Sequence, residues 1–166
     1  MHAGTIYQHL KSNELFKTTP ENALTDLSNG VHSTVFQPGQ SIFTKNDVAD
    51  AMYIIASGTV KIHDGEVVIA TFGAGAFFGE LSLLDSGLRS LSATAEEETE
   101  LLQISRDAVF NIFKKDPKVL MNLVSEIVRR MRKQDEEMVG QLKSREKVLE
   151  NLVAERTAQL EEKMRP

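Results

Sequence analysis

The sequence contains no cysteine, and this absence excludes disulfide bonds, thiolate metal sites and cysteine nucleophiles. It also lacks any apolar run near the roughly 18 residues that a membrane-spanning helix needs. The polar stretch at the start, MHAGTIYQHLKSNE, does not have the pattern of a signal peptide. We therefore predict a cytoplasmic protein with no membrane partner.

Basic residues are in the minority: 19 lysines and arginines face 24 acidic residues, and the net charge is -5. An acidic chain gains no long-range electrostatic attraction for DNA, RNA or an anionic membrane, so we expect no direct nucleic-acid binding. The four histidines are scattered without the spacing of metal ligands, so no metal site is predicted. No serine lies in a nucleophile elbow and no two carboxylates are placed for acid–base work, which predicts that the chain is not an enzyme.

The 166 residues suffice for one domain of ordinary size and a tail. Glycine marks the middle of the chain, because eight of the ten glycines lie from Gly30 to Gly87. Before them, residues 1–30 carry apolar side chains at roughly helical spacing and are predicted to form an N-terminal helical segment. Within it, Thr19-Pro20-Glu21 predicts a helix start with Thr19 as the cap and Pro20 in the first turn.

Residues 31–104 are predicted to form short strands. Six segments rich in β-branched residues are separated by glycine or aspartate turns; they read VHSTVF, SIFT, AMYIIA, GTVKIHD, EVVIATF and ETELLQIS. Asp64-Gly65 between two of them predicts a two-residue hairpin turn. Strands this short and close together favour a barrel or sandwich of about eight strands over βαβ units.

Residues 105–166 are predicted to be helical. Ser105 begins a helix that runs to about Lys115, and Asp116-Pro117 caps and starts another. From Lys118 to Arg165 there is no proline and one glycine, so this helix could reach roughly 70 Å at 1.5 Å per residue. We divide the region into hinge and lid helices at 105–137 and a coiled-coil extension at 138–166.

A helix of this length needs a partner helix, since a domain of about 130 residues cannot bury it. Steps of alternating four and three residues define a heptad seam, of which seven of eleven positions are apolar: Val124, Val128, Met131, Asp135, Met138, Leu142, Arg145, Leu149, Leu152, Arg156 and Gln159. The three charged residues in the seam would help to fix its register. The seam predicts a parallel homodimer; the alternative is one amphipathic helix packed on its own domain.

The segment from Phe77 to Ala95 carries the candidate chemistry. Glycines before it allow tight turns, and Glu80-Leu-Ser-Leu-Leu predicts one helical turn whose first N–H groups, with Ser82 in reach, suit a phosphate. Arg89, nine residues after Glu80, is predicted to begin a strand and to return over that cradle. One carboxylate, one guanidinium and several amides suit a sugar phosphate; the alternative is a structural ion pair across a loop.

FGELSLLDSGLRS resembles the phosphate-binding cassette of the cyclic nucleotide-binding domain family, with the same spacing from glutamate to arginine. The stretch from Phe36 to Ile62 is similar to the family's first β-roll strands, and the resemblance covers about residues 10–140. It implies a cyclic nucleotide as ligand, with Glu80 on the ribose 2′-hydroxyl and Arg89 on the exocyclic phosphate oxygens. It further implies backbone amides from Gly79, Leu81 and Ser82 and a hydroxyl contact from Ser90.

In members that resemble the catabolite activator protein, the helix after the roll covers the base, and this places Gln134 and Asp135 there. Asp135 has two interpretations: it sets the register of the seam, or it accepts hydrogen bonds from guanine that adenine cannot supply. Leu88 replaces a frequent proline, Ser82 a frequent alanine and Asn46 a frequent glycine. No helix-turn-helix follows residue 140.

The predicted fold is mainly β with flanking helices, a double-stranded, jelly-roll-like β-roll followed by a long dimerising helix. The predicted function is a regulatory sensor of cAMP or cGMP that signals through the dimeric coiled coil, without a cofactor or metal. Leu152 to Glu162 resembles helical linkers that precede catalytic modules in bacterial signalling proteins, which predicts an output domain beyond the chain. The alternatives are a binding-dead dimerisation scaffold and a truncated transcription regulator of the same family.

Overall fold

The structure is a computed structural model that describes residues 1–85 and 87–166. By its contacts the chain divides into two units, residues 1–122 and residues 123–166, and each is described by itself. Among the described residues, no helix is both long and apolar enough to cross a membrane.

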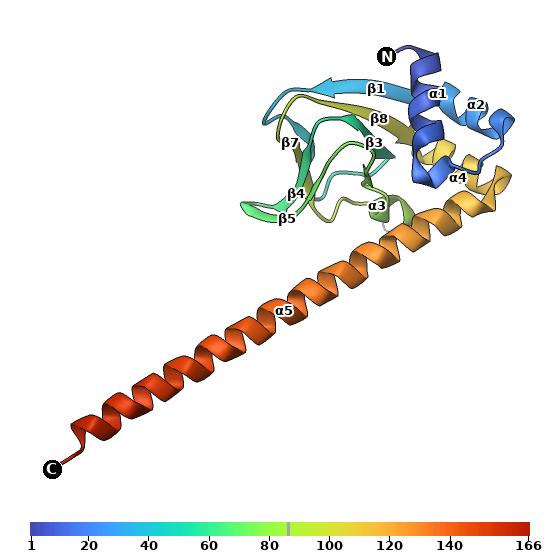
Figure 1. The fold of residues 1–166 in the computed structure, drawn as a ribbon. Coiled ribbons are helices and arrows are strands. Elements are labelled where there is room, and N and C mark those ends of the chain that lie inside the picture. Colours follow the sequence, from blue (N-terminus) through green and yellow to red (C-terminus); the bar gives the residue numbers. More distant parts are fainter. Residues whose placement is uncertain (86) are drawn as a thin grey trace. The chain divides into compact units, whose positions relative to one another are not determined.

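The first unit contains a β-roll with helices before and after it (Figure 1). The helical elements of the chain are α1 (Ala3–Ser12), η1 (Glu14–Phe16), α2 (Glu21–Asn29), α3 (Leu81–Leu84), α4 (Arg106–Lys115) and α5 (Pro117–Lys163). The strands are β1 (Val31–Phe36), β2 (Ser41–Phe43), β3 (Ala51–Ser57), β4 (Val60–Asp64), β5 (Val67–Phe72), β6 (Phe77–Phe78), β7 (Ser92–Ala95) and β8 (Thr99–Ser105). The predicted β-roll of short strands, flanking helices and a long last helix is confirmed.

The strands form two antiparallel sheets of four, in the orders β1-β8-β3-β6 and β2-β7-β4-β5. Side chains from both sheets meet in the interior, where Tyr53 stacks on Phe78 with ring centroids 5.2 Å apart. Phe43, at the end of β2, lies 6.0 Å from each of these rings. The interior therefore carries an aromatic cluster at the point where β2, β3 and β6 come together.

Two local predictions need correction. The hairpin turn is Gly65-Glu66 rather than Asp64-Gly65, because Asp64 still pairs with Val67. Thr19 does not cap α2: its hydroxyl donates to the Asp116 carboxylate at 3.0 Å, and Pro20 directly precedes the helix. A tertiary partner thus takes the side chain that local pattern assigns to the cap.

The helix signals after the roll are confirmed. The Ser105 hydroxyl accepts from the Ala108 amide at the start of α4. Asp116 interrupts the helices, and its carboxylate accepts from the Lys118 amide at 3.3 Å in the first turn of α5. Without a proline to end it, α5 continues for 47 residues.

Candidate functional site

The turn between β6 and α3 depends on Gly79. Its φ of +81° lies in the left-handed region, which glycine adopts without strain. A Cβ at this position would lie 2.8 Å from Nη1 of Arg89. The glycine therefore reverses the chain and also leaves room for a guanidinium against the backbone.

Glu80 directly precedes α3, and its carbonyl accepts from the amides of Leu83 and Leu84 at 3.1 and 3.2 Å. The residue is buried, with 6% of its surface exposed. Among the described residues, the amides of Leu81 and Ser82 donate no backbone hydrogen bond, because the first turn of a helix leaves its N–H groups unpaired. A buried acidic residue thus directly precedes the first amides of a single helical turn.

Arg89 is held in place through its backbone. Its amide donates to the Asp47 carbonyl at 2.8 Å, and its own carbonyl accepts from the Asn46 amide at 2.8 Å. Asn46 has a φ of +76°, so asparagine takes the left-handed conformation here. Arg89 does not begin a strand, because β7 starts at Ser92; its neighbour Leu88 forms an isolated β-bridge with Val48.

The guanidinium of Arg89 is buried, with only 2% of the residue exposed. Nη1 donates to the Gly79 carbonyl at 2.7 Å and Nη2 to the Ala51 carbonyl at 2.6 Å. The Phe43 ring lies 4.1 Å from the guanidinium carbon, within the range of a cation–π contact. Three elements far apart in the sequence thus hold this side chain in one orientation.

One nitrogen of this guanidinium is left without a partner among the described residues. Nε is buried and has no hydrogen-bond partner among the described residues. Burial lowers the pKa of Arg89, and nearby groups, Tyr53 first among them, act in the opposite direction. A buried cation with an unused donor is costly unless a partner satisfies it. The site therefore fits a ligand that carries an anionic acceptor such as a phosphate.

The structure brings together five of the eight predicted site residues: Gly79, Glu80, Leu81, Ser82 and Arg89. Ser82 is buried, whereas the side chain of Leu81 is exposed. Ser90 follows Arg89 and is exposed. Ser86, in the gap of the predicted cassette, lies outside the described residues. The roles of these side chains stay predictions.

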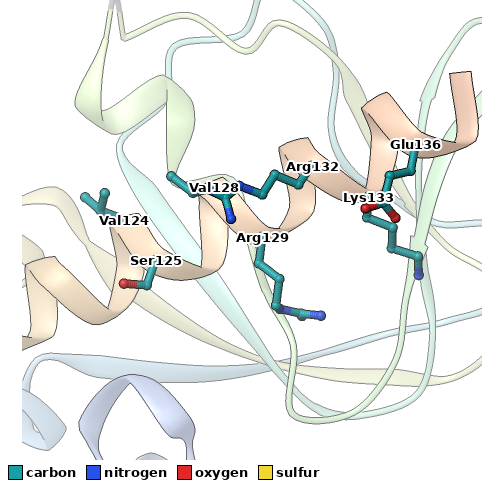
Figure 2. A pocket seen from close by; sticks show the side chains of 7 residues that line it. All are labelled: Val124, Ser125, Val128, Arg129, Arg132, Lys133 and Glu136. Carbon is teal, nitrogen blue, oxygen red and sulfur yellow. The ribbon is translucent and has the colours of Figure 1, made fainter. Parts of the chain in front are cut away.

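Gln134 and Asp135 belong to the second unit, on α5, and both are exposed. A hollow of about 610 Å³ lies along the same helix and is lined by Val124, Ser125, Val128, Arg129, Arg132, Lys133 and Glu136 (Figure 2). None of these seven is a predicted site residue. Glu126 lies one turn before Arg129 on this helix and is partly buried. Hydrogen bonds from Arg129 lower the pKa of Glu126.

Two contributors to the site were missed by the sequence reasoning. Phe43 belongs to the aromatic cluster of the interior and also stacks on the Arg89 guanidinium. The Ala51 carbonyl accepts from Nη2 across 38 positions of sequence, and no residue pattern indicates a backbone acceptor. Among the described residues, no group of three His, Asp or Glu side chains could hold a metal ion.

The sequence of this chain is similar to those of known proteins. Residues 33–116 match the family described as "Cyclic nucleotide-binding domain". The cyclic AMP receptor protein of Thermus thermophilus is 40% identical over 109 residues, which cover 63% of this chain and 50% of that protein. The cGMP-dependent protein kinase of Toxoplasma gondii is 35% identical over 100 residues, which cover 60% of this chain and 10% of the kinase.

Among solved structures, the catabolite activator protein of Thermus thermophilus superposes with a TM-score of 0.66 at 33% identity. The match covers 76% of this chain and 62% of that one. The chain thus spans about half the length of the bacterial receptor and a tenth of the kinase. These similarities concern the domain that the chain shares with the longer proteins. They do not show that the chain has the activities of those proteins.

Proposed function

The chain belongs to the cyclic nucleotide-binding domain family, and from this membership we propose that it is a regulatory sensor that binds cAMP or cGMP at Glu80 and Arg89. The observation that carries the proposal is the buried Arg89 guanidinium, which two carbonyls orient and whose Nε has no partner among the described residues. An exocyclic phosphate would satisfy this donor and offset the buried positive charge.

The other predicted residues complete the contact. Glu80 accepts from the ribose 2′-hydroxyl, and the helix-start amides of Leu81 and Ser82 donate to the phosphate. Gly79 keeps the backbone close to the ligand, and Ser90 adds a hydroxyl at the exposed edge. Each role matches a position of the family cassette. The burial of Glu80 and Arg89 supports the roles proposed for these two side chains.

The base contact is proposed for α5. Gln134 and Asp135 cover the base, and Asp135 favours guanine because a carboxylate accepts from the hydrogens on N1 and N2, which adenine lacks. Two copies of the chain pair through α5, and nucleotide binding shifts the population of two arrangements of this pair. A tenfold difference in affinity between the arrangements supplies about 1.4 kcal/mol per site. The signal then passes along α5 to an output domain.

Calorimetric titration with cAMP and cGMP tests the proposal. We expect binding in the micromolar range, near -8 kcal/mol, that Arg89→Ala abolishes and Arg89→Lys weakens, since lysine keeps the charge without the planar fork. Lys61→Ala is the matched control: it removes a cation from β4 and leaves the predicted site unaltered. Circular dichroism establishes that each variant is folded.

Two results would overturn the sensor. Absence of heat and of a thermal shift with both nucleotides would favour a dimerisation scaffold whose roll binds nothing. If the Arg89→Ala protein bound nucleotide as strongly as the unaltered chain, the nucleotide would bind at a site other than Arg89. A helix-turn-helix encoded beyond residue 166 would instead favour a transcription regulator with the same sensor domain.

A further inference from the structure

The apolar side chains of α5 recur every eleven residues. One column consists of Ile127, Met138, Leu149 and Leu160, and a second, four residues later, consists of Met131, Leu142, Val153 and Met164. We call these eight residues the eleven-residue stripe. Seven of them are exposed large hydrophobic side chains, and only Ile127 is half-buried. The stripe is therefore a largely exposed apolar face of α5 among the described residues.

The stripe differs from the heptad seam in its charge. The seam includes the charged residues Asp135, Arg145 and Arg156, whereas all eight positions of the stripe are apolar. An eleven-residue repeat corresponds to 3.67 residues per turn, and on such a helix the two columns lie about 33° apart. A strict heptad repeat imposes a left-handed supercoil, and an eleven-residue repeat a right-handed one.

Charged residues on both sides of the stripe follow the same repeat. One flank carries only acidic charges from residue 131 on: Asp135 and Glu146 are eleven residues apart, and so are Glu150 and Glu161. The other flank carries only basic charges over the same length, namely Arg145, Arg156 and Lys163, the first two again eleven apart. The repeat thus governs apolar, acidic and basic positions together, which supports eleven residues as the structural period.

These flanks determine which partner fits. In a parallel pair of helices related by a two-fold axis, the acidic flank of each helix meets the basic flank of the other. In an antiparallel pair, acidic flanks would face one another. In the parallel pair, Arg145 of one copy lies level with Glu146 of the partner subunit. It is also within reach of the acidic flank one helical turn further along the partner helix. The partner with matching charge and spacing is a second copy of this chain, parallel and in register.

We propose that two copies of this chain pair in parallel through the eleven-residue stripe, as a nearly straight or right-handed coil rather than a left-handed heptad coil. The inference rests on the dimeric sensor proposed above and specifies its interface. Most of the residues that line the hollow in Figure 2, Arg129, Arg132 and Lys133 among them, fall away from both columns of the stripe, whereas Val124 and Val128 lie on its flank. None of the eight stripe residues lines that hollow.

Single-cysteine cross-linking distinguishes the two faces, and the chain contains no cysteine of its own. Val153 and Leu160 belong to the stripe only, and their neighbours Leu152 and Gln159 belong to the heptad seam only. A disulfide requires Cβ atoms about 3.5–4.5 Å apart. We expect Val153→Cys and Leu160→Cys to form disulfide-linked dimers on mild oxidation, and the adjacent variants Leu152→Cys and Gln159→Cys to remain mostly monomeric on a non-reducing gel.

The reverse pattern, or an absence of cross-links at all four positions, would overturn the proposal. Leu160→Cys also tests direction, because in an antiparallel pair this residue would not meet its own copy. Calorimetry with cAMP on the same four proteins keeps the questions separate. Nucleotide binding without stripe cross-links refutes only the interface, and stripe cross-links without nucleotide binding refute only the sensor.

A charge exchange tests the flanks. Arg145→Glu is expected to weaken the dimer about tenfold at low salt, as measured by sedimentation equilibrium. The double variant Arg145→Glu/Glu146→Arg exchanges the signs of both flanks at one level and is expected to recover most of that loss. Equal dissociation constants for the single variant and the unaltered chain would contradict the parallel arrangement.

Discussion

Replacement of Gly79 by alanine tests whether the backbone at this turn positions the Arg89 guanidinium. The new Cβ would lie 2.8 Å from Nη1, closer than such contacts allow, and the φ of +81° is unfavourable for alanine. The guanidinium must move, and it then gives up its 2.7 Å hydrogen bond to the Gly79 carbonyl. Gly75→Ala is a close control, because Gly75 has a φ of +86° and nothing within 4 Å of the added Cβ.

Both variants should lose about 1–2 kcal/mol of unfolding free energy to the left-handed conformation. Gly79→Ala should lose about 1 kcal/mol more, the typical net value of one hydrogen bond. Its nucleotide affinity should fall roughly ten- to a hundredfold, since a displaced Arg89 loses a charge-assisted bond of about 1.5–3 kcal/mol, while Gly75→Ala binds like the unaltered chain. Urea denaturation and calorimetry measure both effects. Equal stability of the two variants with unchanged affinity would refute this account of Gly79.

Three further predictions concern the site, the interior and α5. Glu80→Gln should weaken cAMP and cGMP binding about tenfold, since a neutral amide accepts a ribose hydroxyl less strongly; calorimetry that finds equal affinity would remove Glu80 from the site. Phe78→Ala should lower the unfolding free energy by about 3–5 kcal/mol, because Phe78 is 1% exposed and stacks on Tyr53; a loss under 1 kcal/mol in urea denaturation would contradict its place in the interior. Hydrogen bonds from Arg129 lower the pKa of Glu126 in the folded chain, so their contribution is present above its ordinary pKa and is lost as the pH falls through the lower folded value. Glu126→Gln should therefore reduce the acid dependence of helicity measured by circular dichroism; an unchanged dependence would contradict a contribution from this pair.

Much of the fold was predictable because its signals are local. The boundaries of the strand-rich region, at Val31 and Ser105, agree with the predicted 31–104 within one residue. The helix caps at Ser105 and Asp116 were predictable for the same reason, since a capping side chain acts on amides two or three residues away.

Elements that depend on distant partners were not predictable. Strands β6 and β7 have only two and four residues, and β6 exists because Phe77 and Phe78 pair with Ile54 and Tyr53 of β3. Arg89 was assigned to a strand because a pattern cannot show that Asp47 and Asn46 hold its backbone from a loop. For the candidate site, residue types and spacing predict Glu80 and Arg89, but not the carbonyl and the ring that orient the guanidinium.

The period of α5 also bears on the role of Asp135. In the heptad seam this residue lies between the two helices, where its charge would be expensive to bury and would serve to fix the register. In the eleven-residue stripe it lies on the acidic flank, next to the apolar face but outside it. A carboxylate in that position is not enclosed between the two helices and can accept from a base. The interface that excludes charge is therefore also the one that leaves Asp135 available to discriminate guanine from adenine, so dimer contact and base selection can occupy different faces of the same helix.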